Sequence, residues 1–218
     1  MSTIRAGLFV GINSYDSAQL TGACADAERM SSFFTDKFDY VDTYVDDLAT
    51  KESVSGYFDS VVEVFEKNSQ DNNGSGVLVF FFSGHGIDRD GRQYLILSDE
   101  EEIDLAEIES KTRIPNVHRV FILDCCRVLG HQQNSYGVWD FILDLCPKVV
   151  RAPGRWLKNY IKANTVDADS AIYQEGCEQP IYIVSCGRGQ VSYDGNQGGC
   201  FTTELLKALN TKSVKTRL

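Results

Sequence analysis

Two short stretches of this sequence contain residue types that can carry out nucleophilic chemistry. His85 lies between two glycines in SGHG, residues 83–86, and the cysteines Cys125 and Cys126 stand side by side. A cysteine becomes a strong nucleophile as the thiolate, and an imidazole is a common base for its activation. SGHG read alone is also compatible with a simple turn, because glycine lets the backbone turn sharply. Together, the two stretches offer a candidate cysteine nucleophile and a candidate histidine base.

Both stretches follow apolar runs that are typical of buried strands. VLVFFF, residues 77–82, precedes the histidine, and VFIL, residues 120–123, precedes Asp124 and the cysteines. Continuous apolar runs favour strands of a parallel sheet that is covered on both faces. Ligands of such sheets bind beyond the carboxyl ends of the strands. If the two strands are neighbours, His85 and the cysteines meet at that edge.

Hydrophobic periodicity predicts an α/β fold with a mostly parallel central sheet of about six strands and helices on both faces. The predicted strands are 4–12, 40–45, 77–82, 94–97, 117–123 and 181–184. The predicted helices are 26–34, 51–67 and 202–209, with a loop at 69–75 and an exposed helix start in the acidic run 99–110. We expect a single domain, 1–218, with a folded, helical insertion around 128–178.

Composition narrows the function classes. The 218 residues carry a formal net charge of −10, which argues against nucleic-acid binding, and no apolar stretch reaches the ~18 residues of a membrane span. No signal peptide precedes the first apolar run. Seven cysteines form an odd set without a CxxC pair, so we expect reduced thiols, a cytoplasmic location and no structural zinc site.

The two motifs, FFFSGHG and FILDCCR, resemble those of the caspase-like cysteine peptidase clan, which includes caspases, metacaspases, paracaspases and bacterial relatives. GLFVGINSY, LTGACADAERM and SCGRGQVSYDGNQGGCFTTELLKAL resemble further metacaspase segments in the same order. The resemblance thus covers nearly the whole chain. His85 precedes Cys126 by 41 positions, near the roughly 50 that is typical of caspases.

The resemblance implies roles for individual residues. In the family pattern the nucleophile stands two residues after a Gln or Asp, which is Cys126 here, whereas Cys125 takes a small buried position. Alternate side chains of a strand point to opposite faces, so only one of the two can face His85. A switching disulfide between the two cysteines is the alternative. The backbone N–H groups of Gly86 and Cys126 would form the oxyanion hole.

The resemblance also predicts which bond is cut. Caspases bind aspartate through an Arg and a Gln, at the positions of Leu20 and Asp124 in this chain. Asp26 and Asp124 instead match acidic pocket residues of metacaspases and paracaspases, with Ser83 and Asp194 as further pocket positions. Paired carboxylates favour a cation and repel aspartate, so we expect cleavage after Arg or Lys. The alternatives are a helix N-cap for Asp26 and a turn for Asp194.

The expected partner is a protein or peptide substrate with a basic residue before the scissile bond, with neither nucleic acid nor membrane involved. Activation by a partner protein or an additional domain is a further expectation. We predict no cofactor and no metal; calcium is the alternative, because many metacaspases need it and DEEEID, residues 99–104, offers oxygen ligands. A non-catalytic caspase-like scaffold is the rival function, and the presence of both His85 and Cys126 argues against it.

Overall fold

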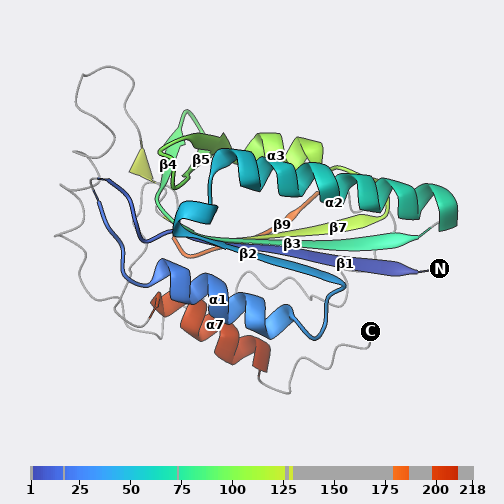
Figure 1. Ribbon diagram of the computed structural model, residues 1–218, viewed down its shortest axis with the longest axis horizontal. Coiled ribbons are helices and arrows are strands. Elements are labelled where there is room, and N and C mark those ends of the chain that lie inside the picture. The colour runs from blue at the N-terminus through green and yellow to red at the C-terminus, as the bar shows by residue number, and fades with distance from the viewer. Residues whose placement is uncertain are drawn as a thin grey trace.

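A five-stranded parallel sheet forms the centre of the protein (Figure 1). The computed structural model describes residues 2–16, 18–72, 74–125, 128–129, 179–186 and 198–210. The sheet order is β2-β1-β3-β7-β9, and every neighbouring pair is parallel. The strands are β1 (Thr3–Gly11), β2 (Tyr40–Val45), β3 (Ser75–Gly84), β7 (Val117–Cys125) and β9 (Ile181–Val184). The α/β prediction is confirmed.

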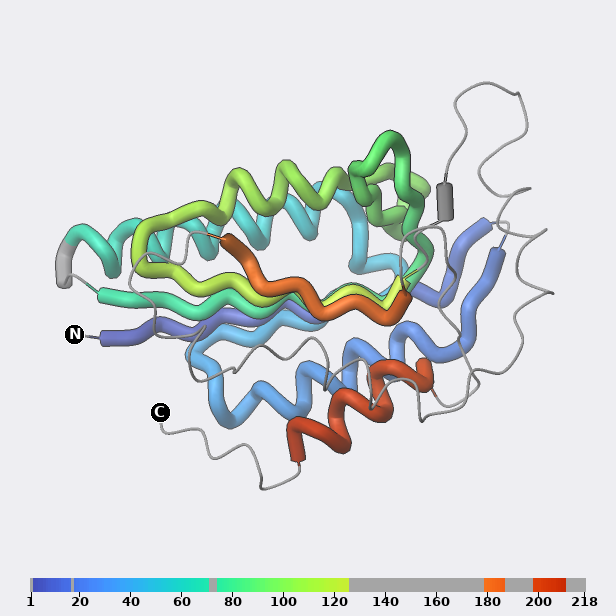
Figure 2. Tube along the Cα trace, turned by 180° about the vertical axis from the view of Figure 1, so that it is seen from behind, coloured from blue at the N-terminus to red at the C-terminus, as the bar shows by residue number. Residues whose placement is uncertain are grey.

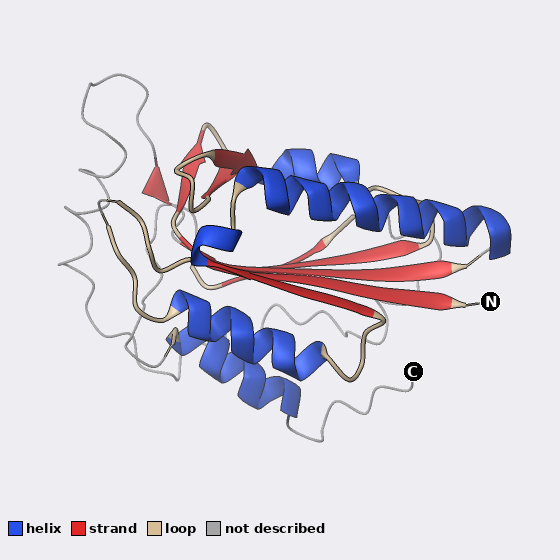
Figure 3. Ribbon diagram, viewed as in Figure 1, coloured by secondary structure: helices blue, strands red, loops and turns tan. Residues whose placement is uncertain are grey.

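Helices cover both faces of this sheet (Figure 3). On one face lie α1 (Ala23–Phe34) and α7 (Cys200–Asn210), and on the other lie α2 (Lys51–Asn72) and α3 (Leu105–Lys111). Figure 2 shows the same layers from behind, with β9 at the sheet edge and α7 beside α1. Because helices cover both faces of the sheet, the central strands β1, β3 and β7 bury apolar side chains on both sides.

Alternating side chains of the central strands fill two separate cores. In β1, Leu8 and Val10 pack in the core under α2 and α3, whereas Phe9 packs in the core under α1 and α7. In β3, Phe80 and Phe81 divide between the same two cores. A fully buried side chain of this size contributes roughly 1.5–3 kcal/mol, so these runs anchor the strand ends that follow them.

A smaller sheet lies beyond the carboxyl end of β3, in the order β6-β5-β4-β8. Its strands are β4 (Gly86–Arg89), β5 (Arg92–Ile96), β6 (Glu102–Asp104) and β8 (Val128–Leu129). The predicted strand 94–97 therefore belongs to this sheet and not to the central one. Asp90 and Gly91, with φ of 51° and 87°, join β4 to β5 in a two-residue hairpin loop. Asp-Gly is a strong hairpin signal that the periodicity analysis missed.

Three element boundaries also differ from the prediction. α1 begins three residues earlier than expected, and α2 continues to Asn72 through most of the predicted loop 69–75. The acidic run forms β6 and then α3, whose Leu105 and Ile108 are buried. The helices expected within 128–178 lie outside the described residues. Among the described helices, none combines the length and apolar character needed to cross a bilayer.

Candidate functional site

The carboxyl ends of β3 and β7 lie side by side, as the sequence predicts for neighbouring strands. Their parallel register pairs Ser83 with Asp124 and Gly84 with Cys125. His85 follows directly after β3. Cys126 follows directly after β7 in the sequence and lies outside the described residues. The sheet thus brings the two motifs to one edge, next to the start of α1 (Figure 1).

The pairing has the same offset on both sides of this point. Gly84 pairs with Cys125 in the central sheet, and Ile87 pairs with Val128 in the small sheet. Both pairs join residues that are 41 positions apart, which is also the separation of the predicted histidine and cysteine. The register offset between the two chain segments is therefore the same before and after the positions predicted for the histidine and the cysteine.

The His85 side chain is buried, with 2% of its surface exposed. Its Nε2 lies 2.6 Å from the carbonyl oxygen of Ala18. Because a carbonyl oxygen only accepts hydrogen bonds, this contact places the proton on Nε2. Nδ1 is then the nitrogen that can take up and release a second proton.

Tyr15 holds the histidine from the other side. Its hydroxyl accepts a hydrogen bond from the backbone N–H of His85 and donates one to the carbonyl of Ile96, both at 3.0 Å. The two ring centroids are 4.5 Å apart. Burial raises the pKa of Tyr15 well above its ordinary value, so the phenol stays a neutral donor. The sequence analysis missed Tyr15 and Ala18; a tyrosine soon after the first strand was the available signal.

Asp26 does not cap α1, so the N-cap interpretation is wrong. The N-cap is Gly22, which offers no side-chain bond, and Asp26 lies one turn inside the helix. The side chain of Asn13 serves the helix end instead, since its Oδ1 accepts hydrogen bonds from the N–H groups of Ala23 and Cys24 at 2.9 and 3.4 Å. The Asp26 carboxylate is thereby left for other partners.

Asp26 and Asp124 approach the same backbone residue, and we call this pair of carboxylates the acidic pocket. Asp26 Oδ2 accepts the N–H of Gly199 at 2.7 Å, and Asp124 Oδ2 accepts the hydroxyl of Thr202 at 2.9 Å. A Cβ on Gly199 would lie 2.6 Å from Asp124 Oδ2 and 3.0 Å from Asp26 Oδ2, so only glycine fits. Both carboxylates also lie at the N-terminus of α7, where the helix dipole favours negative charge.

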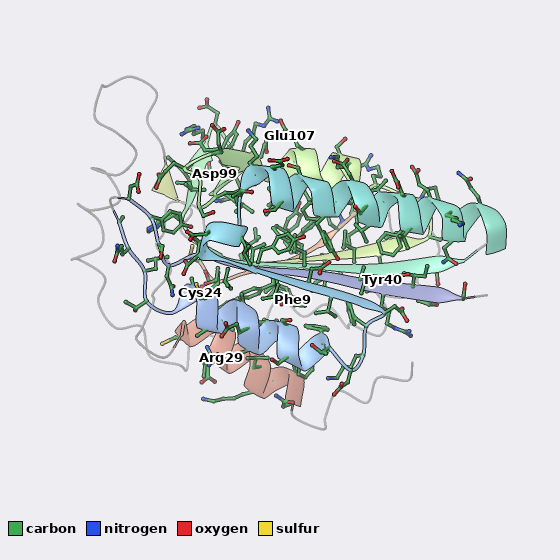
Figure 4. The ribbon with its side chains drawn as sticks, in the orientation of Figure 1. Phe9, Cys24, Arg29, Tyr40, Asp99 and Glu107 are labelled. Atoms are coloured by element: carbon green, nitrogen blue, oxygen red, sulfur yellow. The ribbon has the colours of Figure 1, made fainter. Side chains whose placement is uncertain are left out.

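Burial sets the protonation of this pocket. Asp26 is 1% and Asp124 is 5% exposed. Burial raises the pKa of Asp26 to about 6; the N–H of Gly199 and the guanidinium of Arg29 oppose this rise, and the charge of Asp124 adds to it. Arg29, one turn along α1, forms an ion pair with Asp26 that the sequence analysis did not predict. Figure 4 shows Arg29 on the α1 and α7 side of the sheet.

The remaining predicted site residues fall into two groups. Ser83 is buried opposite Asp124, and Gly86 is the buried first residue of β4. The side chain of Cys125 is buried, 2% exposed, and its backbone carbonyl accepts a hydrogen bond from the thiol of Cys186 at 3.2 Å. This agrees with its expected place as a small buried side chain. Asp194, Cys126 and the disulfide proposed between the two cysteines lie outside the described residues.

The acidic run lines a cavity of about 460 Å³ on the opposite face of the sheet, which we call the acidic groove. Its lining residues are Lys51, Tyr94, Glu100, Glu101, Glu102, Asp104 and Glu107. Three of the carboxylates form ion pairs with cations: Glu101 with Lys51, Glu102 with Arg89, and Asp104 with Arg92. In the described part of the chain, no group of three or more His, Cys, Asp or Glu side chains is arranged to hold a metal ion.

Comparisons with known proteins agree with this geometry. The family model of the caspase domain, peptidase family C14, matches residues 4–217. A crystal structure of the protein GSU0716 from Geobacter sulfurreducens is similar in fold, with a TM-score of 0.60, 20% identity and coverage of 95% of this chain and 81% of that one. Comparison with curated proteins finds no match. Because the caspase-domain model spans nearly the entire sequence, this chain belongs to the caspase-domain family of peptidases.

Proposed function

We propose that this protein is a cysteine endopeptidase that cleaves peptide bonds after arginine or lysine with Cys126 and His85. The observation that carries the proposal is the register of β3 and β7, which ends with Gly84 beside Cys125. Each proposed catalytic residue is the next residue in the sequence after its strand ends. The family adds support, since its model covers the segments that contain both residues.

The proposed reaction begins with attack of the Cys126 thiolate on the substrate carbonyl carbon, which forms a C–S bond. His85, protonated on both nitrogens, then donates its Nδ1 proton to the departing amine as the C–N bond breaks. In the second half, His85 takes a proton from water, and the resulting hydroxide attacks the thioester and breaks the C–S bond. The carbonyl of Ala18 keeps the Nε2 proton in place through both steps.

The oxyanion that forms on the substrate carbonyl needs donors that are already in position. We assign this role to the backbone N–H groups of Gly86 and Cys126. Removal of one such donor typically costs about 10²–10³ in kcat, so backbone position at the start of β4 matters for the rate. Gly86 is the buried first residue of β4 and pairs with Leu95 of β5.

The acidic pocket supports the choice of a basic residue before the scissile bond. Asp26 and Asp124 present two buried carboxylates, and Ser83 lies in register beside Asp124. Such a pocket attracts a guanidinium or ammonium group and repels a carboxylate. We include Asp194 as a further carboxylate. The proposal also includes a single cytoplasmic domain, no cofactor, and activation by a partner protein or an additional domain.

The test is turnover of fluorogenic peptides that end in Arg, Lys or Asp, with and without calcium. We expect cleavage after Arg and Lys alone, independent of calcium, and its complete loss in Cys126→Ala. Cys125→Ala is the matched control and should keep most of the activity. Cleavage after Asp, or loss of activity in Cys125→Ala with retention in Cys126→Ala, would contradict the proposal. No turnover of any peptide would mean either the scaffold function or an enzyme that still needs its activating partner.

A further inference from the structure

The acidic pocket already contains a cation that belongs to the protein itself. The Nη2 of Arg29 binds Asp26 Oδ1, and its Nη1 donates to the hydroxyl of Thr203 at 3.2 Å. The second oxygen of Asp26 accepts the N–H of Gly199. Both oxygens of Asp26 are therefore engaged by donors from within the chain.

The backbone at Gly198 packs closely against the side chain of Arg29. Gly198 has a φ of 99°, a conformation that favours glycine. A Cβ at this position would lie 2.1 Å from Arg29 Nη2 and 2.4 Å from Asp26 Oδ1. Gly198 and Gly199 thus lie against the ion pair, and Arg29 is its more exposed partner, at 36% against 1% for Asp26.

The contact of Arg29 with Asp26 allows a substrate cation to displace it. The arginine contributes one nitrogen to Asp26 and not the two parallel hydrogen bonds of a bidentate Arg–carboxylate pair. Its Nε is buried and makes no hydrogen bond within the described residues. Of the whole side chain, 36% remains exposed. A substrate guanidinium can bind in the bidentate geometry, whereas an ammonium group binds as a point charge, but each must displace the same side chain.

We propose that Arg29 is an internal competitor in the acidic pocket: it must leave Asp26 before a substrate cation binds there, which lowers the apparent affinity for arginine and for lysine by the same factor. This inference rests on the proposed function, since it concerns the same pocket. Loss of Arg29 should therefore strengthen binding of both cations equally.

The test uses two small probes that need no turnover, n-butylguanidine and n-butylamine, titrated by calorimetry into the wild-type chain and Arg29→Gln. The measurements are made at pH 8, because the pKa of Asp26 is about 6 and the loss of Arg29 raises it further. We expect n-butylamine to bind about tenfold more tightly to the variant, a factor that corresponds to ~1.4 kcal/mol. The gain for n-butylguanidine should be equally large, because both ligands displace the same side chain from Asp26.

Two further variants separate charge from folding. Arg29→Lys keeps a cation beside Asp26, so its affinities should stay within about twofold of wild type if the competition is electrostatic. Arg89→Gln removes another partly exposed arginine from an ion pair, with Glu102, far from the pocket in sequence, and should also leave both affinities unchanged. Circular dichroism checks that each variant is folded.

The outcomes for the inference and for the proposed function are distinct. Unchanged or weaker probe binding by folded Arg29→Gln overturns the inference, as does the absence of binding by every variant. Peptide turnover that disappears in Cys126→Ala tests the proposed function alone, because the probes do not involve the thiol. An active peptidase whose Arg29→Gln variant keeps the wild-type KM for Arg and Lys peptides would retain the function and lose the inference.

Discussion

The acidic pocket and the acidic groove, on opposite faces of the sheet, use carboxylates in different ways. The pocket has only Asp26 and Asp124, both almost fully buried. The groove has five acidic side chains, and those of its ion pairs range from 4% exposed for Asp104 to 63% for Glu101. Burial has raised the pKa of Asp26 to about 6. Both carboxylates of the pocket are buried, whereas in the groove Asp104 alone is buried and the other four acids are partly or fully exposed.

Solvation explains why ion pairs in the two regions should differ in free energy. An exposed ion pair exchanges good hydration for a screened attraction and contributes about 0–1 kcal/mol. A buried carboxylate has lost its hydration, so it depends on its few protein donors and binds a desolvated cation strongly. The pocket should therefore respond strongly to single substitutions, whereas the groove should tolerate them. Each prediction below compares the two regions.

The largest effect is expected from loss of charge in the pocket. Asp26→Asn keeps an oxygen for the N–H of Gly199 but removes the negative charge that would face a basic substrate. We expect kcat/KM for Arg peptides to fall by about 100–1,000-fold, as for loss of one partner of a buried charge pair. Glu101→Gln in the groove is the control and should change it by less than about twofold. A similar loss in both variants would remove the distinction between the regions.

The pocket should also make stability depend on pH. The pKa of Asp26 is raised from 3.8 to about 6, so between these values the folded state binds a proton that the unfolded state lacks. The free energy of unfolding of the wild type, relative to Asp26→Asn, should therefore rise as the pH falls from 6 to 4, by up to about 3 kcal/mol. Urea denaturation of both proteins at several pH values measures this difference. A difference that stays constant, or that falls with acidification, would contradict the buried-charge account.

Tyr15→Phe should destabilise the fold by about 1–3 kcal/mol, because it leaves the backbone N–H of His85 and the carbonyl of Ile96 buried without this partner. Its kcat should also fall, since His85 loses part of its support. Tyr94→Phe in the acidic groove is the matched control and should cost less than about 0.5 kcal/mol. Chemical denaturation measures the free energies of unfolding. Equal losses in the two variants would contradict a specific role for the hydrogen bonds of Tyr15.

Alanine substitutions at two glycines allow a comparison of the pocket with an exposed helix surface. A methyl group on Gly199 would lie 2.6 Å from Asp124 Oδ2, whereas a methyl group on Gly56 in α2 meets no atom within 4 Å. We expect Gly199→Ala to cost about 1–3 kcal/mol and to raise KM for basic peptides. Gly56→Ala should instead stabilise the protein by about 0.5–1 kcal/mol through better helix propensity. Thermal unfolding of the two variants checks the opposite signs.

The smallest effect is expected in the groove itself. Glu102→Gln breaks the partly exposed pair with Arg89. The free energy of unfolding should fall by less than about 1 kcal/mol at low salt, and less again at 1 M salt, where exposed charges are screened. A salt-independent loss of several kcal/mol would show that this pair behaves like the buried pocket.

The sequence predicted more of the central sheet than of the functional site. The runs VLVFFF and VFIL predicted buried strands, because continuous apolar segments are typical of strands covered on both faces. That the two strands are neighbours came from the structure. The Asp90-Gly91 hairpin was missed because periodicity alone does not register turn chemistry. The helix boundaries at Ala23 and Asn72 also differ from the prediction, since capping can come from a distant side chain such as Asn13.

The sequence by itself determined the α/β class, the two motifs, and the family resemblance that the caspase-domain model confirms. These features depend on local residue order and on the alternation of apolar segments. Tertiary structure alone decided that Asp26 accepts the N–H of Gly199, that Ala18 faces His85, and that Arg29 occupies the acidic pocket. The physical reason is that a hydrogen bond or an ion pair depends on distance and burial in three dimensions, and Asp26 and Gly199 are 173 positions apart in the chain.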